Sequence, residues 1–351
     1  MKLAQFGFEL PEKLIAQYPV ENRDESRLLV YYKSTEKIEH RVFKDVKDYF
    51  NDGDVMVFND TKVFPARLFG SKEKTNAQIE VFLLRELNRD IKLWDVLVEP
   101  ARKIRMGNKL YFGANNELTA EVIDNTTSCG RTIRFLSDMQ HEDFKKILLS
   151  LGEMPIPNHI IKRNVEKIDT ERYQTIFAQN EGAVVAPTAG LHFSKILFKR
   201  LEIIGVKLEF ITLHVGLGNF RNIDVEDLTK HKADSEQIFI IEQVATTVNK
   251  AKDENRNICA VGTTVLKALE SSVNTHGYLK PYDGWISKFI FPPYDVILPK
   301  SLITNFHMPK SSIMIAVSGF TGFQELKNIY DIAIKEKYKF GTYGDAMLVM
   351  P

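Results

Sequence analysis

The stretch Ile258-Cys259-Ala260-Val261-Gly262-Thr263-Thr264 decides the fold of this chain. Its four apolar residues have the length and composition of a buried strand, and apolar residues continue with helical spacing after the two threonines. The stretch therefore predicts a strand, a short loop and a helix. The free backbone N–H groups at such a helix start suit a carboxylate or a phosphate. A threonine there could equally cap the helix, and the spacing leaves both interpretations open.

Neighbouring segments alternate in the same way. Strands are expected at residues 27–32, 54–58, 206–213 and 237–241, and helices at 141–151, 194–204 and 242–252, with a further helical pattern at 43–50. Ser194 is expected to cap the second of these helices, and Gly205 lies just past its end. Such alternation predicts an α/β layer domain with a mostly buried sheet.

A different pattern fills residues 63–137. Short strand-like runs follow one another at residues 77–84, 93–98, 109–112, 118–123 and 131–135, with turn residues and no helical pattern between them. Evenly spaced strands of this kind indicate a small antiparallel barrel or sandwich. We therefore predict an α/β domain made of residues 1–62 and 138–351, into which residues 63–137 are inserted as an antiparallel β-barrel domain.

The composition is that of an ordinary globular protein, with 351 residues, 44% of them hydrophobic and 26% charged. Cys129 and Cys259 are far apart, which argues against a disulfide framework or a thiolate zinc site and fits a reducing compartment. Glu9 and Glu12 interrupt the stretch in which a signal peptide needs apolar residues. No apolar run has the length of a membrane span. We expect a cytoplasmic protein with no membrane partner.

The net charge of +1 gives no global attraction to nucleic acid, but phosphate contacts need only a local cluster of cations. The candidate clusters are Arg102-Lys103-Ile104-Arg105 with Lys109, the pair Lys162-Arg163, and Lys335, Lys337 and Lys339. Each cluster alone is also typical of a solvated surface. Charge alone therefore decides nothing.

Four polar stretches punctuated by glycine or proline follow short apolar runs in the C-terminal half, at residues 186–193, 212–220, 304–311 and 343–347. Each contains a His or an Asp beside Gly, Thr or Asn. Glycine permits a close approach of the backbone to a ligand, and loops on a rigid scaffold often carry the chemistry of a protein. The four loops predict one composite polar site.

Two common kinds of site are excluded by spacing. Gly216 and Gly218 begin a dinucleotide-like fingerprint, but its third glycine position is Arg221 and no convincing helix follows. His192, His214 and His307 show no spacing of a known metal-ligand set, so we predict no metal site. These histidines are stronger candidates as proton donors or acceptors, because histidine titrates near working pH.

At these motifs the chain closely resembles the S-adenosylmethionine:tRNA ribosyltransferase-isomerase family of queuosine biosynthesis. The resemblance covers nearly the whole length. It is carried by residues 10–17, 23–28, 53–54, 59–68 and 172–175 and by the four loops. Several matching runs in the same order are very improbable by chance.

The resemblance implies an α/β domain joined to a smaller β-barrel domain, acting as a monomer. It implies transfer of the ribosyl part of S-adenosylmethionine onto an aminomethyl-deazaguanine at the wobble position of a tRNA. Isomerisation of that group gives epoxyqueuosine, with adenine and methionine released. S-adenosylmethionine is then a consumed substrate, and no cofactor is needed.

The resemblance also implies which residues form the site. The expected catalytic residues are His192, His214, His307 and Asp345. The expected substrate-binding residues are Arg67, Thr188, Gly190, Gly216, Gly218, Glu236, Gly262, Thr263, Thr264, Glu270, Asn305 and Lys310. Adenine departs best when protonated and the carbon beside the sulfonium is acidic, so the reaction needs an acid and a base. The sequence does not assign either role.

The chain departs from the family pattern at several positions. Asn219 and Asp234 stand where the family has Thr and His, and Lys267 and Lys339 stand where it has Arg. Arginine and lysine are not equivalent at bidentate sites. Two other functions stay open: an S-adenosylmethionine-dependent tRNA methyltransferase, which would release S-adenosylhomocysteine, and a noncatalytic RNA-binding relative.

Overall fold

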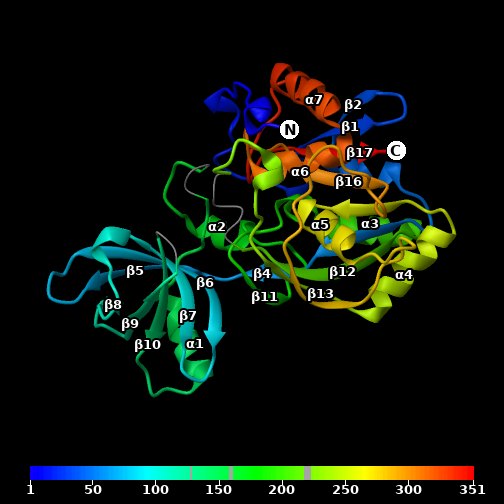
Figure 1. Ribbon diagram of the computed structural model, residues 1–351. Helices are drawn as coiled ribbons and strands as arrows, with labels where there is room; N and C mark the ends of the chain where they lie inside the picture. Colours follow the sequence, from blue (N-terminus) through cyan, green and yellow to red (C-terminus); the bar gives the residue numbers. More distant parts are fainter. Residues whose placement is uncertain (127–128, 158–160, 217–222) are drawn as a thin grey trace.

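The computed structural model describes residues 1–126, 129–157, 161–216 and 223–351. Its larger body is built on a nine-stranded sheet and its smaller body is a β-barrel, as Figure 1 shows. The strand order in the sheet is β15 (Tyr282–Ile286), β13 (Glu236–Ile240), β12 (Lys207–His214), β3 (Val55–Asn59), β14 (Ile258–Val261), β16 (Ser301–Asn305), β17 (Ala346–Met350), β1 (Arg27–Tyr32) and β2 (Ile38–Val42). Both chain ends lie in this larger body (Figure 1).

The strands in the middle of the sheet are parallel. β12 and β14 each pair in parallel with β3, and β14 pairs in parallel with β16. β17 runs antiparallel to β16 and parallel to β1. The central strands β3, β14 and β16 are buried throughout and read as continuous apolar runs, as strands covered on both faces do.

Helices cover both faces of the sheet. The helices α4 (Glu242–Asp253), α5 (Thr263–Ser272), α6 (Ser312–Thr321) and α7 (Phe323–Lys335) pack apolar side chains such as Val248 and Ile315 into one core. On the other face lie α3 (Lys195–Ile204) and the 3₁₀ turns η4 (Phe43–Tyr49) and η6 (Thr188–His192). The predicted caps of α3 are confirmed, because the Ser194 hydroxyl accepts a hydrogen bond from the Leu197 N–H and Gly205 has a φ of 97°. The predicted α/β layer architecture is confirmed.

The smaller body is a closed antiparallel barrel, so the alternative of a sandwich is wrong. The barrel order is β10 (Gly130–Phe135), β7 (Leu93–Glu99), β6 (Gln78–Asn88), β5 (Arg67–Lys72), β8 (Lys109–Phe112) and β9 (Leu118–Asn125). The sequence analysis missed β5, which contains Gly70. A Cβ at Gly70 would lie only 2.3 Å from the Tyr111 carbonyl oxygen, so the glycine permits the close approach of β8.

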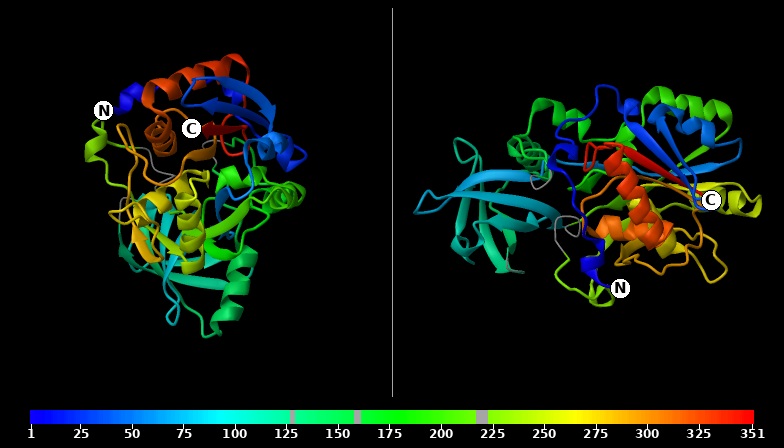
Figure 2. Two further views of the ribbon diagram at one scale, coloured as in Figure 1. Left: turned by 90° about the vertical axis from the view of Figure 1, so that its right-hand side faces the viewer. Right: turned by 90° about the horizontal axis from the view of Figure 1, so that it is seen from above.

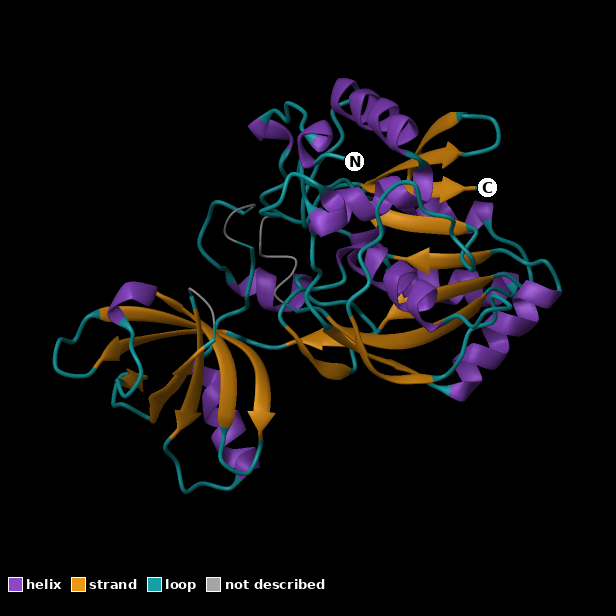
Figure 3. Ribbon diagram, viewed as in Figure 1, coloured by secondary structure: helices purple, strands orange, loops and turns teal. Residues whose placement is uncertain are grey.

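A junction joins the two bodies, seen from above in the right-hand view of Figure 2 and coloured by structure in Figure 3. There β4 (Thr61–Val63) pairs in parallel with β11 (Asn180–Ala183). The helix α1 (His141–Leu151) follows residue 137 in the chain, but its Phe144 and Leu148 pack into the barrel core. The domain boundaries at residues 63 and 137 stay a prediction.

The remaining elements are short. They are α2 (Lys167–Arg172), η1 (Leu3–Phe6), η2 (Glu12–Leu14), η3 (Arg23–Glu25), η5 (Ala101–Lys103) and η8 (Leu228–Lys230). None of the helices in the described ranges combines the length and the apolar character that a membrane crossing requires.

Candidate active site

Polar residues gather at one edge of the nine-stranded sheet. The parallel strands β12, β3, β14 and β16 all end at this edge, β12 with His214 and β16 with Asn305. Antiparallel β13 begins there with Glu236, and β17 begins there directly after Asp345. Ligands of open α/β sheets bind outside the carboxyl ends of parallel strands. We therefore take this edge as the candidate active site.

His192 is buried at this edge between two polar partners. Its Nδ1 lies 2.7 Å from the Ser26 Oγ, and its Nε2 lies 3.3 Å from the Asn305 Oδ1. The ring packs on Phe43 with 4.9 Å between centroids. Burial lowers the pKa of His192 to about 4, although the Asn305 contact acts in the opposite direction. The imidazole is therefore neutral at pH 7.

His307 and Asp345 are also buried, His307 against the side chain of Thr304 and Asp345 against backbone N–H groups. The His307 Nε2 lies 2.8 Å from the Thr304 Oγ1, and burial lowers the pKa of His307 to about 3. The Asp345 carboxylate accepts hydrogen bonds from the backbone N–H groups of Arg27 and Lys339, at 2.8 and 2.7 Å. Burial raises the pKa of Asp345 in spite of these two hydrogen bonds. Asp345 thus ties the start of β1 to the loop before β17.

His214 lies farther along the edge, at the junction with the barrel. Its Nδ1 is 2.8 Å from the Thr61 Oγ1, and its imidazole lies against Gly182. Burial lowers the pKa of His214, while the charge of Asp60 acts in the opposite direction. His214 lines a cavity, so this imidazole is in reach of a ligand.

Two neighbouring cavities open at this end of the molecule. The first, of about 350 Å³, is called here the helix-start cavity because it lies at the beginning of α5. It is lined by residues that include Asp234, Glu236, Thr263, Thr264, Lys267 and Lys288. The second, of about 480 Å³, is called the junction cavity because the barrel and the sheet both contribute to it. It is lined by residues that include Arg85, Glu86, Trp94, His214, Gly216 and Trp285. Asp234 lines both cavities.

A buried ion pair crosses the helix-start cavity. The Lys267 amine contacts the Glu236 carboxylate, whose side chain is 4% exposed. Burial lowers the pKa of Lys267 to about 8, and the charge of Asp234 acts in the opposite direction. Lys267 and Asp234, two of the departures from the family pattern, therefore lie together in one cavity.

The other expected site residues divide into two groups. Thr188 and Gly190 lie in η6 beside His192, and Gly262 has a φ of 94° at the start of α5, so these three are at the same edge. Glu270 lies elsewhere: its carboxylate is 1% exposed and accepts hydrogen bonds from Tyr294 and from the backbone of residues 297 and 298. It holds the chain before β16 and does not line either cavity.

Four further residues named in the sequence analysis lie outside the two cavities or outside the described residues. Arg67 begins β5, where it bonds the Ile156 carbonyl at 3.3 Å and contacts Glu80. Lys310 has a φ of 60°, and its backbone N–H bonds the Phe6 carbonyl. Gly218 and Asn219 fall in residues 217–222, which the structure does not describe.

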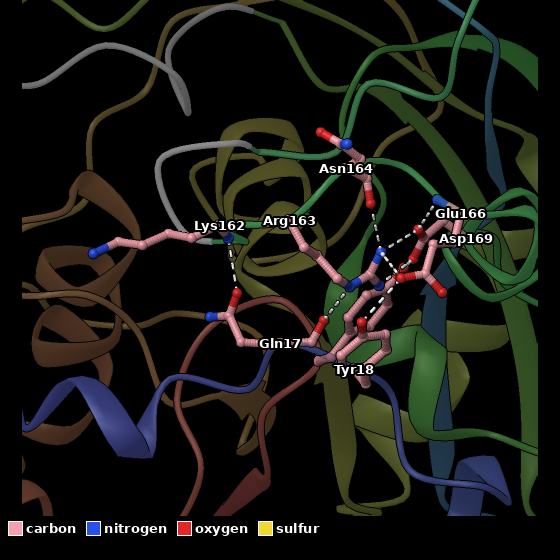
Figure 4. Close-up of polar contacts among 8 residues, drawn as sticks. Gln17, Tyr18, Lys162, Arg163, Asn164, Glu166 and Asp169 are labelled. Atoms are coloured by element: carbon pink, nitrogen blue, oxygen red, sulfur yellow. Dashed lines mark hydrogen bonds and ion pairs between the residues drawn. The ribbon is translucent and has the colours of Figure 1, made fainter.

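Lys162 and Arg163 are adjacent in sequence, but their side chains point in different directions, as Figure 4 shows. The Arg163 guanidinium binds both carboxylate oxygens of Asp169, at 2.7 and 2.8 Å, and lies over the ring of Tyr18. The Lys162 side chain extends away from that cluster. Together with Lys13 and Lys339 it lines a cavity of about 660 Å³ that also reaches Asp345. The Lys162 amine donates to the Glu12 carboxylate at 2.6 Å in an exposed pair that a phosphate would have to displace, whereas Arg163 is a structural cation.

Some residues that line the two cavities were missed by the sequence analysis as site residues. Trp94, Trp285 and Lys288 line the cavities, yet they stand in no polar loop. Thr61 lies in the run 59–68 that carries the family resemblance, and that run is the signal that could have pointed to it. Among the residues described, no three His, Cys, Asp or Glu side chains lie close enough together to hold a metal ion.

Comparison with known proteins gives the family. The family model described as queuosine biosynthesis protein matches residues 3–349. The chain belongs to this family. The chain is 62% identical over 350 residues to the S-adenosylmethionine:tRNA ribosyltransferase-isomerase of Bacteroides fragilis, with 100% of this chain and 99% of that protein covered. It is 61% identical to the enzyme of the same name from Flavobacterium psychrophilum, with both chains covered in full.

A solved structure supports the same assignment. The S-adenosylmethionine tRNA ribosyltransferase of Thermotoga maritima matches with a TM-score of 0.56 and 29% identity, covering 99% of this chain and 100% of that one. The queuosine family therefore accounts for both bodies of the fold, the sheet domain and the barrel. The resemblance predicted from the motifs is confirmed.

Proposed function

We propose that this protein is an S-adenosylmethionine:tRNA ribosyltransferase-isomerase. It transfers the ribosyl group of S-adenosylmethionine to the aminomethyl-deazaguanine at the wobble position of a tRNA and isomerises it to give epoxyqueuosine. Adenine and methionine are the other products. The observation that carries this proposal is the identity of about three residues in five with enzymes of that name over the whole chain.

The helix-start cavity suits the methionine end of the donor. Its wall includes Thr263 and Thr264 at the start of a ten-residue helix, where free N–H groups and the helix dipole favour a carboxylate. Glu236 and Asp234 supply the negative charge that an ammonium or a sulfonium requires. S-adenosylmethionine enters here as a substrate that is consumed, and the reaction needs no metal or other cofactor.

His214 is the best-placed base. Its lowered pKa keeps the imidazole neutral at pH 7, which a base requires. The Thr61 hydroxyl lies 3.5 Å from the Asn180 carbonyl and 2.8 Å from the His214 Nδ1. With the hydroxyl proton directed to that carbonyl, Nδ1–H donates to Thr61 and Nε2 is the free acceptor. In this arrangement His214 removes the acidic proton beside the sulfonium.

His192, His307 and Asp345 support this reaction from the same sheet edge. Because both histidines have a lowered pKa, they act at pH 7 as neutral imidazoles that accept or donate a hydrogen bond. Burial raises the pKa of Asp345, whose two oxygens accept the Arg27 and Lys339 backbone N–H groups and so hold the loop before β17 at this edge. The tRNA is bound with the help of exposed lysines around Lys162, and the enzyme works as a monomer in the cytoplasm.

Product analysis tests the function. The protein is incubated with S-adenosylmethionine and a tRNA that carries the aminomethyl base, and then adenine, methionine and the modified nucleoside are measured. We expect all three to appear in equal amounts, and none with unmodified tRNA. Release of S-adenosylhomocysteine would instead indicate a methyltransferase. RNA binding without any product would indicate a noncatalytic relative.

A further inference from the structure

Lys288 is a half-buried lysine that lines the helix-start cavity just after the edge strand β15. Its amine donates hydrogen bonds to the Glu270 backbone carbonyl at 2.6 Å and to the Tyr294 hydroxyl at 3.1 Å. Both acceptors are uncharged, and among the described residues no carboxylate forms an ion pair with this amine. The protein therefore holds a cation in the cavity wall without neutralising it.

The buried carboxylate of Glu270 fixes the surroundings of that amine. Glu270 is 1% exposed and accepts hydrogen bonds from the Tyr294 hydroxyl at 2.9 Å and from the backbone N–H groups of Ile297 and Leu298 at 3.1 and 3.0 Å. Burial and the charge of Glu270 raise the pKa of Tyr294, so its hydroxyl keeps its proton and donates it to the carboxylate. The hydroxyl oxygen is then the acceptor for Lys288. A chain of hydrogen bonds thus runs from α5 through Tyr294 to the amine.

Lys288 shares the cavity with the starts of two helices. Thr263 and Thr264 begin α5, Ser312 and Ile313 begin α6, and all four line the cavity. Both helices have ten residues. The first N–H groups of a helix have no acceptor within it and carry the positive end of its dipole. Together with a fixed lysine, they favour a carboxylate in this cavity.

The acidic residues of the same cavity suit the other end of an amino acid. Asp224, Asp234 and Glu236 line it, and Glu236 is partly neutralised by its contact with Lys267. An ammonium or a sulfonium is favoured beside such carboxylates. The cavity therefore offers both signs of charge, as the zwitterionic methionine end of the donor requires.

Two further lysines of the cavity are less suited to this task. Lys230 and Lys232 also line it, but both are exposed. An exposed lysine loses side-chain entropy when a ligand orders it. The Lys288 amine is already held by two hydrogen bonds, so a ligand meets a cation that is in place before binding.

We propose that Lys288 binds the carboxylate of the donor's methionine end and that Glu270 positions it through Tyr294. This inference rests on the proposed function and deepens it, because it names a specificity-determining residue of the donor site. Lys288 distinguishes an amino acid from an amine that lacks the carboxylate. Glu270 lines neither cavity and acts on the donor only through its neighbours.

Decarboxylated S-adenosylmethionine tests the proposal, because it keeps the adenosine, the sulfonium and the ammonium and lacks only the carboxylate. Adenine release is measured with each donor at a saturating concentration of tRNA that carries the aminomethyl base. In the wild-type protein, kcat/KM should be about tenfold or more higher for S-adenosylmethionine, because hydrogen bonds between charged groups are the strong ones.

Variants of the chain assign the preference. Lys288→Met keeps an unbranched stem and removes the amine, so the KM for S-adenosylmethionine should rise about tenfold with kcat little changed. The constants for the decarboxylated donor should stay the same. Tyr294→Phe removes only the hydroxyl that holds the amine, and it should raise the KM for S-adenosylmethionine by about threefold.

Lys252→Met is the matched control. The Lys252 amine donates to the backbone carbonyls of His276 and Gly277 and lies 4.6 Å from the ring centroid of Tyr278. This arrangement is like that of Lys288, whose amine lies 5.5 Å from the centroid of Tyr294, but Lys252 is on α4 and lines neither cavity. The control variant should keep the wild-type KM for both donors.

The opposite results overturn the proposal. Equal losses with both donors in Lys288→Met would mean that the lysine supports the loop and not the carboxylate. A higher KM for tRNA with an unchanged KM for the donor would assign Lys288 to an RNA phosphate. A wild-type protein that releases adenine equally well from both donors defeats only the carboxylate site, whereas absence of release from S-adenosylmethionine defeats the proposed function.

Discussion

Gly182 lies flat against the imidazole of His214. A Cβ built on Gly182 would stand 2.7 Å from the His214 Cε1 and 2.8 Å from both ring nitrogens, closer than real Cβ contacts. Gly182 of β11 therefore restrains the imidazole by packing against its face. Thr61 of β4 restrains it through the hydrogen bond to Nδ1. The strand pair that joins the two bodies is thus also the support of the proposed base.

Gly182→Ala should displace the imidazole and reduce turnover by about 100-fold, because a shift of about 1 Å in a catalytic group can cost that much. The fold should persist, since the added methyl group meets a side chain at the rim of a cavity. Adenine release and thermal unfolding measure the two effects. Gly216→Ala is the control, because its new methyl group would lie 3.9 Å from the nearest atom. The pKa of His214, followed by NMR, should change in the Gly182 variant and not in the Gly216 variant.

Asp169→Asn should destabilise the fold by about 3–5 kcal/mol, because it leaves the Arg163 guanidinium buried without its carboxylate. Asp169 is fully buried and also accepts a hydrogen bond from the Tyr343 hydroxyl at 2.8 Å. Glu166→Gln is the matched control. Its carboxylate is 49% exposed and lies 3.7 Å from the same guanidinium, so its loss should cost about 0–1 kcal/mol. Equal shifts of the unfolding midpoint in the two variants would contradict this account of Figure 4.

Acid should destabilise the protein through His192. Its pKa is about 4 in the folded state and about 6.5 in the unfolded state. The unfolded chain therefore binds more protons as the pH falls from 6.5 to 4, and stability is lost over that window, on the order of 3 kcal/mol for this one group. The free energy of unfolding should fall less between pH 7 and pH 4.5 in the His192→Gln variant than in the wild-type protein. An unchanged pH dependence would show that His192 does not carry this effect.

Binding of tRNA should depend strongly on salt in spite of the net charge of +1. Affinity should fall by about tenfold or more over a fourfold rise in salt, because phosphate contacts release counterions. Lys162→Ala and Lys339→Ala should each lower the slope of log affinity against log salt by about 1. Lys250 is an exposed lysine of α4 and does not line the cavity that Lys162 and Lys339 share. Lys250→Ala should therefore leave the slope unchanged. A flat profile for the wild-type protein would mean that these lysines are only solvated.

The strands and helices that local pattern could predict are those with continuous apolar runs or clear caps. β8 (Lys109–Phe112) and α1 (His141–Leu151) begin and end at the predicted residues. β5 was missed because its side chains follow no two-residue alternation, and β4 because it is only three residues long. Their conformation depends on partners distant in sequence, such as the Tyr111 carbonyl opposite Gly70 and β11 opposite β4.

The sequence by itself determined the family, the alternation of strands and helices, and the polar loops that end at one sheet edge. These features follow from local patterns of apolar and turn residues and from motifs that are continuous along the chain. Only the tertiary structure decided which side chains share a cavity. Trp94 of the barrel and Trp285 of the sheet line one cavity, whereas Glu270 lines neither cavity and holds the chain before β16. No local pattern encodes such contacts, because they depend on how the barrel and the sheet pack and on which buried polar groups satisfy one another.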